Sequence, residues 1–353
     1  MHYLSGSNFF LIFALSAMPP CVSVVLPVYN VASYIEATIA SILEQTFTDF
    51  ELLVFDDCST DDTAVRVQSI RDPRLRFIQN PRNLGRAGTD NAALPHVRGK
   101  FIAKMDGDDL CHPERLARQV AFLEGNPDVN VVGAWIQNFG ASTYLNRYPA
   151  SPDAAQVLTL FTLPAGNPAV MLRTSLFRDQ GLTYDNTLRQ TEDYDFFARY
   201  VRELRVASLP EVLVQYRVLP NADTVKTNIL VERATISDDV RAQLLTDWGL
   251  LYSARELHVY NTIAMLDRSL RDVSLGEVEA WLQRLIQFNN EHPLFEPAAL
   301  RQGLGERWFE VCYTHVQPRL GSILQFGRSS LSTYFSLSGR QRFRFFAKSF
   351  QRF

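Results

Sequence analysis

Phe101-Ile102-Ala103-Lys104-Met105-Asp106-Gly107-Asp108-Asp109 is the stretch that decides the predicted fold, because a strand-like apolar run ends there in three carboxylates on a glycine turn. Carboxylate oxygens suit hard cations such as Mg²⁺ or Mn²⁺, and such a cation typically also holds a substrate diphosphate. A solvated acidic turn is the alternative, since Asp and Gly favour turns on conformational grounds alone. The surrounding sequence decides between the two.

The stretch contains the fourth strand of an alternating pattern. Strands are predicted at residues 22–26, 52–55, 75–78 and 101–105, and helices at 35–45, 64–70 and 91–97, with a loop at 80–88. This alternation predicts an α/β fold with a mostly parallel sheet flanked by helices.

Polar motifs follow three of these strands. Strand one ends at Pro27-Val28-Tyr29-Asn30, strand two at Asp56-Asp57, and strand four at the acidic turn. In open α/β sheets, ligands bind outside the carboxyl ends of the strands. The three motifs are therefore expected to meet at one edge of the sheet, which favours a binding site over a solvated turn.

The second part of the chain carries one further acidic motif. Thr191-Glu192-Asp193-Tyr194-Asp195 begins a helix predicted to run to residue 203, with Thr191 as its N-cap. Acids in the first turn also suit the helix dipole, so Glu192 and Asp193 have a structural explanation too. Two short strand-like runs follow at 205–209 and 212–217. Beyond a boundary near 218–228, helices are predicted at 229–245, 254–270 and 278–288.

Composition limits the class of protein. The chain has 353 residues, 46% hydrophobic and 21% charged, as in an ordinary folded protein, and its net charge of −3 argues against general nucleic-acid binding. The cysteines are few and widely spaced, without a Cys-x-x-Cys pair, which excludes a zinc ribbon and disfavours a disulfide framework. We therefore expect a reducing compartment, the cytoplasm.

The two ends of the chain differ in character. Residues 9–17 are apolar but too short to span a bilayer, and no Lys or Arg precedes them as in a signal peptide. Residues 1–17 are therefore expected to be an extension before a true start at Met18, or a weak membrane contact. At the other end, a helix over 340–353 would have one phenylalanine face and an opposite basic face, made of Phe343, Phe346, Phe350 and Phe353 and of Arg340, Arg344, Lys348 and Arg352. Such a tail either lies peripherally at the inner face of an anionic membrane or packs on the body of the protein.

The motifs together resemble those of the family 2 glycosyltransferases, which have the GT-A fold. The resemblance covers about residues 20–220 and consists of motifs in a fixed order. They are Val24-Val25-Leu26-Pro27-Val28-Tyr29-Asn30, Ser41-Ile42-Leu43-Glu44-Gln45-Thr46-Phe47, Glu51 to Asp57 with Ser59 and Asp62, Asn83-Leu84-Gly85, Asp106 to Asp109, and Glu192-Asp193. The implied organisation is a GT-A domain over 18–220 and a helical C-terminal region over 221–353 that carries the basic amphipathic tail.

The resemblance implies roles on the donor side. Pro27, Tyr29 and Asp57 match positions that hold the nucleobase and ribose of a nucleotide-sugar. A carboxylate such as Asp57 accepts the imide N–H of uracil, which favours a UDP-sugar, although thymine presents the same group. Arg86 either approaches a phosphate or lies on the surface.

The resemblance also assigns the metal and the acid–base residues. Asp106 and Asp108 match the Asp-x-Asp signature, which contacts the ribose and a divalent metal, Mg²⁺ or Mn²⁺, and Asp109 replaces or supplements either. Asp193 matches the catalytic base of an inverting reaction, and Glu192 orients the acceptor.

The implied function is transfer of a sugar from a nucleotide-sugar to a hydroxyl of a glycan or lipid-linked acceptor, in cell-envelope polysaccharide biosynthesis. The alternatives are a sugar-nucleotide pyrophosphorylase-type nucleotidyltransferase and a non-catalytic glycosyltransferase-like binding protein. A pyrophosphorylase normally has a Gly-rich basic loop after strand one, which this chain lacks. The chain departs from the family at 166–171, where members often carry a His and this sequence has Asn167-Pro168-Ala169.

Overall fold

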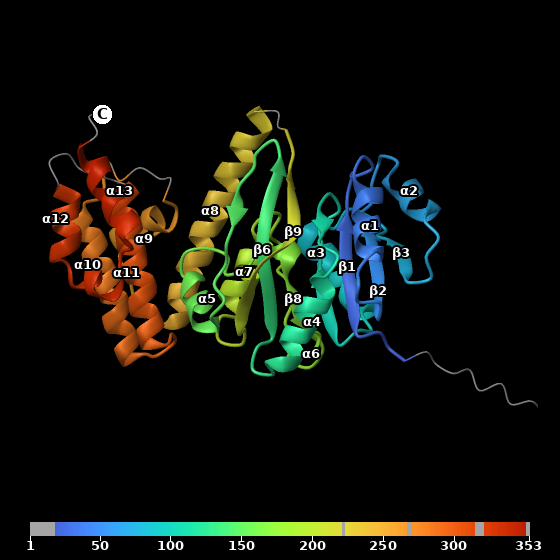
Figure 1. Cartoon of the computed structure of the whole chain (residues 1–353), viewed down its shortest axis with the longest axis horizontal. Helices are drawn as coiled ribbons and strands as arrows, with labels where there is room; N and C mark the ends of the chain where they lie inside the picture. The colour runs from blue at the N-terminus through green and yellow to red at the C-terminus, as the bar shows by residue number, and fades with distance from the viewer. Residues whose placement is uncertain (1–17, 221–222, 267–269, 271, 315–320, 351–353) are drawn as a thin grey trace, which may run out of the picture.

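The computed structural model describes residues 18–220, 223–266, 270, 272–314 and 321–350, with only the backbone of 223–229 and 349–350. The predicted N-terminal extension, 1–17, lies outside these ranges. Within them, a nine-stranded sheet is flanked by helices and followed by a helical region (Figure 1). The predicted α/β class with a helical C-terminal region is confirmed.

The N-terminal half of the sheet is parallel, as predicted. Its adjacent strands pair in the order β3-β2-β1-β4. Every residue of the second strand is buried, as expected for a parallel sheet covered on both faces. The elements of this half are β1 (Val22–Val28), α1 (Ile35–Leu43), β2 (Phe50–Asp56), α2 (Thr63–Ser69), β3 (Leu75–Gln79), α3 (Gly85–Ala93), η1 (Leu94–His96), β4 (Phe101–Lys104), β5 (Leu110–Cys111) and α4 (Arg115–Gly125).

The other half of the sheet is mixed. Strand β8 (Met171–Arg173) is antiparallel to both β4 and β6 (Val131–Gly140), while β6 is parallel to β9 (Val206–Val218). The short strands β5 and β7 (Leu145–Asn146) add antiparallel pairs at β9 and β6. The expectation of a mostly parallel sheet therefore describes the first half only.

Two predicted elements differ from the structure because distant residues decide them. Helix α3 begins at Gly85, inside the predicted loop, since the Asp57 carboxylate accepts hydrogen bonds from the backbone N–H groups of Leu84 and Gly85. The runs at 205–209 and 212–217 form the single strand β9. Its register shifts opposite Trp135, around Pro210, because proline lacks the N–H that a sheet ladder needs.

Helices form the rest of the chain. Helices α9 and α10 each begin with a capping box, Ser253 with Glu256 and Ser274 with Glu277. Helix α9 ends at Ala264, before the predicted residue 270. The remaining elements are α5 (Pro152–Leu158), η2 (Asn167–Ala169), α6 (Ser175–Arg178), α7 (Glu192–Arg199), α8 (Asp223–Trp248), α9 (Ala254–Ala264), α10 (Leu275–Glu291), α11 (Pro297–Thr314), α12 (Gly321–Arg328), η3 (Ser330–Tyr334) and α13 (Gly339–Phe350).

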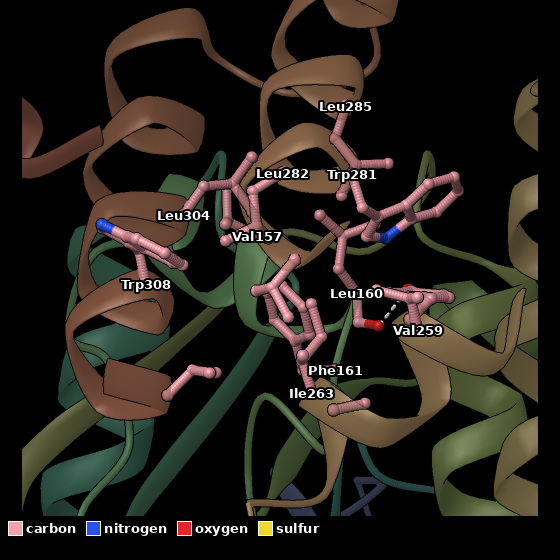
Figure 2. Close-up of a cluster of buried hydrophobic side chains, with 14 of the residues drawn as sticks. Val157, Leu160, Phe161, Val259, Ile263, Trp281, Leu282, Leu285, Leu304 and Trp308 are labelled. Atoms are coloured by element: carbon pink, nitrogen blue, oxygen red, sulfur yellow. Dashed lines mark hydrogen bonds between the residues drawn. The ribbon is translucent and has the colours of Figure 1, made fainter. Parts of the chain in front are cut away.

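One apolar cluster joins the sheet half of the molecule to the C-terminal helices. Val157, Leu160 and Phe161, from α5 and the loop after it, pack with residues of α9, α10 and α11 such as Trp281 and Trp308 (Figure 2). All five are buried. The region after residue 220 therefore shares its core with the preceding one, while the predicted boundary near 218–228 stays a prediction.

Helix α13 combines features of both predicted alternatives for the tail. Phe345, which the predicted phenylalanine face did not include, is 2% exposed and packs against Phe309 and Phe326. Phe343 and Phe346 are exposed by 72% and 52%. The side chain of Phe350 and all of residue 353 lie outside the described residues. None of the described helices combines the length and apolar character that crossing a membrane requires.

Candidate active site

The carboxyl ends of β1, β2 and β4 meet as predicted. The backbone N–H of Asp57 donates to the Val28 carbonyl at 2.8 Å, and the Thr38 hydroxyl donates to the Gly107 carbonyl at 3.0 Å. Pro27 is half-buried, and Tyr29 beside it is 48% exposed. The Pro27–Tyr29 motif, Asp57 and the acidic turn therefore lie at one edge of the sheet.

Asp57 has a structural task that the sequence did not reveal. Its carboxylate accepts hydrogen bonds from the Asn80 amide at 2.9 Å and from the N–H groups of Leu84 and Gly85 at 2.7 and 2.9 Å. Gly85 has φ +75°, a conformation that favours glycine. Three bonds use three of about four acceptor positions on a carboxylate, so one position remains for a ligand N–H.

Two aspartates of the acidic turn lie where a ligand can reach them. Asp106 pairs with the Arg86 guanidinium at 3.1 Å. Asp108 is partly exposed, and burial, followed by the charge of Asp106, raises the pKa of its carboxyl. The charge of Asp106 disfavours ionisation of Asp108, which a nearby cation would relieve.

Asp109 differs from its two neighbours. It is fully buried, and its Oδ1 accepts a hydrogen bond from the Arg217 N–H at 2.8 Å. Burial and then the charge of Asp106 raise its pKa to about 8. Its Oδ2 has no hydrogen-bond partner among the described residues. Its predicted metal role stays a prediction.

Arg217 is a residue at this site that sequence reasoning missed. Its Nε donates to the Asp108 carbonyl at 2.9 Å, and its guanidinium lies over the rings of Tyr34 and Phe139, 4.7 and 4.5 Å from their centres. It therefore holds the backbone of the acidic turn from β9. Nothing local in the sequence signals this contact, because Arg217 is more than a hundred residues from the turn.

The donor set suits a divalent cation that shares its ligands with a substrate. Among the described residues, no group of three or more His, Cys, Asp or Glu side chains is arranged to hold a metal ion. Mg²⁺ in phosphate-transfer sites typically binds one or two carboxylates plus substrate phosphates instead of an all-protein cage. Asp106 and Asp108, with the orphaned Oδ2 of Asp109 behind them, fit that arrangement.

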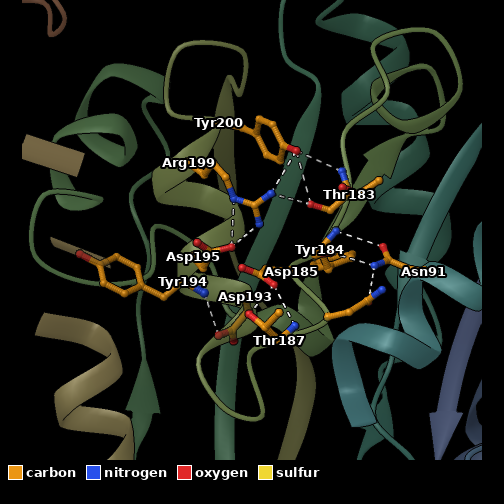
Figure 3. Close-up of polar contacts among 11 residues, drawn as sticks. Asn91, Thr183, Tyr184, Asp185, Thr187, Asp193, Tyr194, Asp195, Arg199 and Tyr200 are labelled. Carbon is orange, nitrogen blue, oxygen red and sulfur yellow. Dashed lines mark hydrogen bonds and ion pairs between the residues drawn. The ribbon is translucent and has the colours of Figure 1, made fainter. Parts of the chain in front are cut away.

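Glu192 and Asp193 form the first turn of α7. Asp193 accepts a hydrogen bond from the Tyr194 N–H at 2.8 Å, and Asp195 pairs with Arg199 one turn later (Figure 3). Burial and then the charge of Asp193 raise the pKa of Glu192 to about 7. Burial also raises the pKa of Asp193, although the Arg86 charge opposes this.

Thr191 occupies the N-cap position of α7 that the sequence predicted, but it does not cap the helix through its side chain. Its side chain makes no capping hydrogen bond, and its φ of +66° places it in the left-handed region. That conformation is a genuine outlier for a β-branched residue, and such strain clusters at functional sites. The surrounding structure therefore stabilises a strained backbone at Thr191, which directly precedes Glu192 and Asp193.

A pocket of about 350 Å³ brings Arg86, Asp106, Glu192 and Asp193 together. The positive charge of Arg86 offsets the negative charges of the three carboxylates. Asp106, and then Glu192 and Asp193, raise the pKa of the Arg86 guanidinium. Many lining residues come from elements remote in sequence, and the sequence analysis did not identify them. They include Asn138, Tyr144, Asn146, Tyr148, Gln190, Tyr216 and Arg233.

Known proteins share this fold and sequence. The family model described as Glycosyl transferase family 2 matches residues 23–183. The putative glycosyltransferase EpsE of Bacillus subtilis is 34% identical over 215 residues, which cover 59% of this chain and 76% of EpsE. WfgD of Escherichia coli, a UDP-Glc:α-D-GlcNAc-diphosphoundecaprenol β-1,3-glucosyltransferase, is 39% identical over 105 residues, 30% of this chain and 42% of WfgD.

Solved structures agree on the fold. S. aureus TarS 1–349 in complex with UDP-GlcNAc has a TM-score of 0.57 at 19% identity, covering 84% of this chain and 93% of TarS. The mannosyltransferase PcManGT of Pyrobaculum calidifontis, solved with GDP-Man and Mn²⁺, has a TM-score of 0.52 at 19% identity and covers 88% of each chain.

Fold and sequence thus define a glycosyltransferase of the GT-A type. The chain belongs to glycosyl transferase family 2. A succinoglycan biosynthesis protein, ExoO of Rhizobium meliloti, is also similar to it, with 32% identity over 191 residues that cover 51% of this chain and 55% of ExoO.

Proposed function

We propose that this protein is an inverting, metal-dependent glycosyltransferase that moves a sugar from a UDP-sugar to a hydroxyl of a glycan or lipid-linked acceptor. The observation that carries the proposal is the single pocket in which the acid pair Glu192–Asp193 faces Arg86 and Asp106. Leaving-group stabilisation and proton abstraction need different groups, and this pocket contains candidates for both.

On the donor side, the nucleotide lies along Pro27 and Tyr29, and the uracil imide N–H donates to the remaining acceptor position of Asp57. The preference for UDP is supported by TarS, which was solved with UDP-GlcNAc. Asp106 and Asp108 hold the divalent cation, with Asp109 as a supplementary ligand. When bound, that cation supplies charge neutralisation at the diphosphate.

Arg86 changes partner in this scheme. In the protein alone its guanidinium neutralises Asp106. Its side chain is 51% exposed, so it can turn toward a phosphate oxygen when a donor is present. A guanidinium binds phosphate through paired N–H donors, which suits this task.

The transfer itself requires only one base from the protein. The oxygen of the acceptor hydroxyl attacks the anomeric carbon and forms the new C–O bond. The bond from that carbon to the diphosphate oxygen breaks, and its electron pair leaves with the diphosphate. The hydroxyl proton passes to a carboxylate oxygen of Asp193, and Glu192 orients the acceptor.

The acceptor and the location are part of the proposal. WfgD acts on a sugar attached to diphosphoundecaprenol, which supports a lipid-linked or glycan acceptor in cell-envelope polysaccharide assembly. We place the protein in the cytoplasm, with α13 in contact with the inner face of the membrane. Phe343 and Phe346 are exposed there, on a helix that carries Arg340, Arg344 and Lys348 and no acidic residue.

Incubation with Mn²⁺ and a panel of UDP-, GDP- and dTDP-sugars tests the proposal. We expect slow release of free sugar and UDP from a UDP-sugar, together with thermal stabilisation of the protein by UDP and Mn²⁺. Nucleoside triphosphate formed from nucleotide-sugar and pyrophosphate would instead identify a pyrophosphorylase. A folded protein that neither binds nor cleaves any of these donors would overturn the proposal.

A further inference from the structure

The wall of the pocket beside Asp193 comes from the C-terminal helical region. Arg233, Ser237 and Arg241 line it from α8, and they are spaced four residues apart, so they lie on one face of the helix. Ala264 and Met265, at the end of α9, complete this wall. Residues after 220 thus form part of the cavity that contains the acid pair.

Two arginines fix α8 against the rest of the pocket. Arg241 is buried; it donates to the Phe161 carbonyl at 3.2 Å and to the Asn261 side chain at 2.9 Å. Arg233 is exposed, and its Nε donates to Gln190 Oε1 at 2.9 Å. Because Gln190 directly precedes Thr191, this bond connects α8 to the segment that leads into the acid pair.

Thr191 carries the clearest sign of a missing ligand. Thr191 lines the pocket, and its Oγ1 is buried and has no hydrogen-bond partner among the described residues. A buried hydroxyl without a partner loses its hydrogen bonds to water and gains none in return, so native proteins rarely keep one without a use. The left-handed backbone at Thr191 adds a second cost at the same position.

Another part of the pocket lining is aromatic and polar. Tyr144, Tyr148 and Tyr216 form it together with Asn138 and Asn146. Burial and then the charge of Asp193 raise the pKa of Tyr148, so this phenol stays protonated near the acid pair. Aromatic rings offer apolar faces and amides offer hydrogen bonds, which matches a sugar ring, with its C–H faces and its rim of hydroxyls.

Gly166 keeps this side of the pocket open. A Cβ at this position would lie 2.3 Å from the Ile136 Cδ1 and 2.9 Å from the Tyr148 hydroxyl. The volume of about 350 Å³ is near the lower end of the range of roughly 300–1,000 Å³ for small-molecule sites. The pocket therefore has room for one sugar ring.

We infer that α8 and Thr191 form the acceptor subsite, in which Arg233 and Thr191 hydrogen-bond the hydroxyls of a single acceptor sugar ring beside Asp193. This inference rests on the proposed function and extends it to the acceptor. It also assigns a task to the C-terminal region, which contributes acceptor recognition instead of being an appended module.

Saturation-transfer NMR tests the inference without relying on turnover. The probes are methyl glycosides of glucose, galactose, mannose and N-acetylglucosamine, in both anomers, added to the full chain with UDP and Mg²⁺, which is diamagnetic and leaves the proton signals sharp. We expect at least one glycoside to receive saturation from the wild type, with its signal reduced at least about fivefold in Arg233→Ala and in Thr191→Gly. Glycine tolerates the positive φ, so the second variant should keep the fold.

The controls separate the possible failures. Thr191→Ser keeps the hydroxyl and should retain the signal, as should Arg202→Ala, which removes an exposed arginine outside the pocket. UDP affinity measured by calorimetry should stay within about twofold in all variants. Absence of UDP binding in the wild type would overturn the proposed function. UDP binding with no glycoside signal, or with equal signals in Arg233→Ala and Thr191→Gly, would overturn this inference alone.

Discussion

Asp193 and Glu192 share the first turn of α7, and burial raises the pKa of both carboxyls. A general base works best when its pKa lies near the working pH. Arg86 opposes the shift at both residues, because its positive charge favours the ionised forms. The balance between burial and this one cation therefore sets the acidity of the pair.

Replacement of the base tests its role directly. We expect Asp193→Asn to lower the rate of sugar transfer by about 10²–10⁴, because the amide cannot accept the acceptor proton. UDP affinity should persist, since Asp193 does not contact the nucleotide in the proposed scheme. Asp195→Asn is the matched control: Asp195 pairs with Arg199, and its loss should cost only about 0.3–0.5 kcal/mol of stability. Comparable losses of activity in the two variants would contradict the assignment.

The pKa shift of Glu192 predicts how stability depends on pH. Its carboxyl titrates at about 7 in the folded protein and at 4.5 ordinarily, so the folded state holds the proton to higher pH. The unfolded chain ionises first, and the free energy of unfolding should fall between pH 4.5 and 7, on the order of 1–3 kcal/mol from this group. Urea denaturation should show a smaller fall in Glu192→Gln. Parallel pH curves for the two proteins would exclude the shift.

Helix α3 is the element that connects the nucleobase side to the acidic turn. Asp57 binds its first N–H groups, Arg86 pairs with Asp106, and Asp90, one turn later, pairs with Lys104 of β4. The last pair is buried on both sides, with each side chain 4% exposed. Arg86 and Asp90 are four residues apart and lie on one face of α3. The buried Asp90–Lys104 pair therefore fixes the helix in the position in which Arg86 contacts Asp106.

Breaking the buried pair should therefore be costly. We expect Asp90→Asn to lower the free energy of unfolding by about 3–5 kcal/mol, because the Lys104 ammonium would stay buried without a counterion. Adding Lys104→Met should recover most of this loss. Glu36→Gln breaks the exposed pair with Arg66 and should cost no more than about 1 kcal/mol. Chemical denaturation measures all three, and a loss in Asp90→Asn as small as that in Glu36→Gln would contradict the argument.

At the scale of the whole molecule, an apolar cluster and the pocket both include residues from each side of the predicted boundary near 218–228. The apolar cluster that contains Phe161 and Tyr194 also contains Trp281 and Trp308 of the C-terminal helices. Phe161, in the loop after α5, also lines the pocket, as do residues of α8. Packing of the helical region and the shape of the pocket are therefore coupled.

The membrane proposal is tested best by point variants. Phe345 is part of the core, so deletion of the tail would disturb the fold as well as any lipid contact. We expect Phe343→Ser with Phe346→Ser to reduce co-sedimentation with anionic phospholipid vesicles at least about tenfold, since two exposed aromatic side chains no longer insert. Leu251→Ser, at a residue that is 84% exposed elsewhere, should leave binding unchanged. Equal sedimentation of the double variant and the wild type would remove the membrane contact.

Much of the fold followed from local patterns. The strands β1 to β4 and the helices between them were predicted near their observed positions, because each buries an apolar run that is visible in the sequence. Helix α4, strand β6 and helix α11 were not predicted, and the start of α3 was misplaced. The start of α3 was misplaced because the N-terminus of this helix is stabilised by Asp57, which directly follows strand β2, and not by a local cap.

By itself, the sequence determined the order of the first four strands and the helices between them, the acidic turn at Asp106 to Asp109 and the Glu192–Asp193 pair, because these depend on neighbouring residues. Only the tertiary structure decided that Asp57 anchors α3, that Arg217 holds the acidic turn, and that α8 lines the pocket beside Asp193. Each of these contacts joins residues far apart in the chain. Their partners are selected by packing and by the need to pair buried polar groups, which no local pattern encodes.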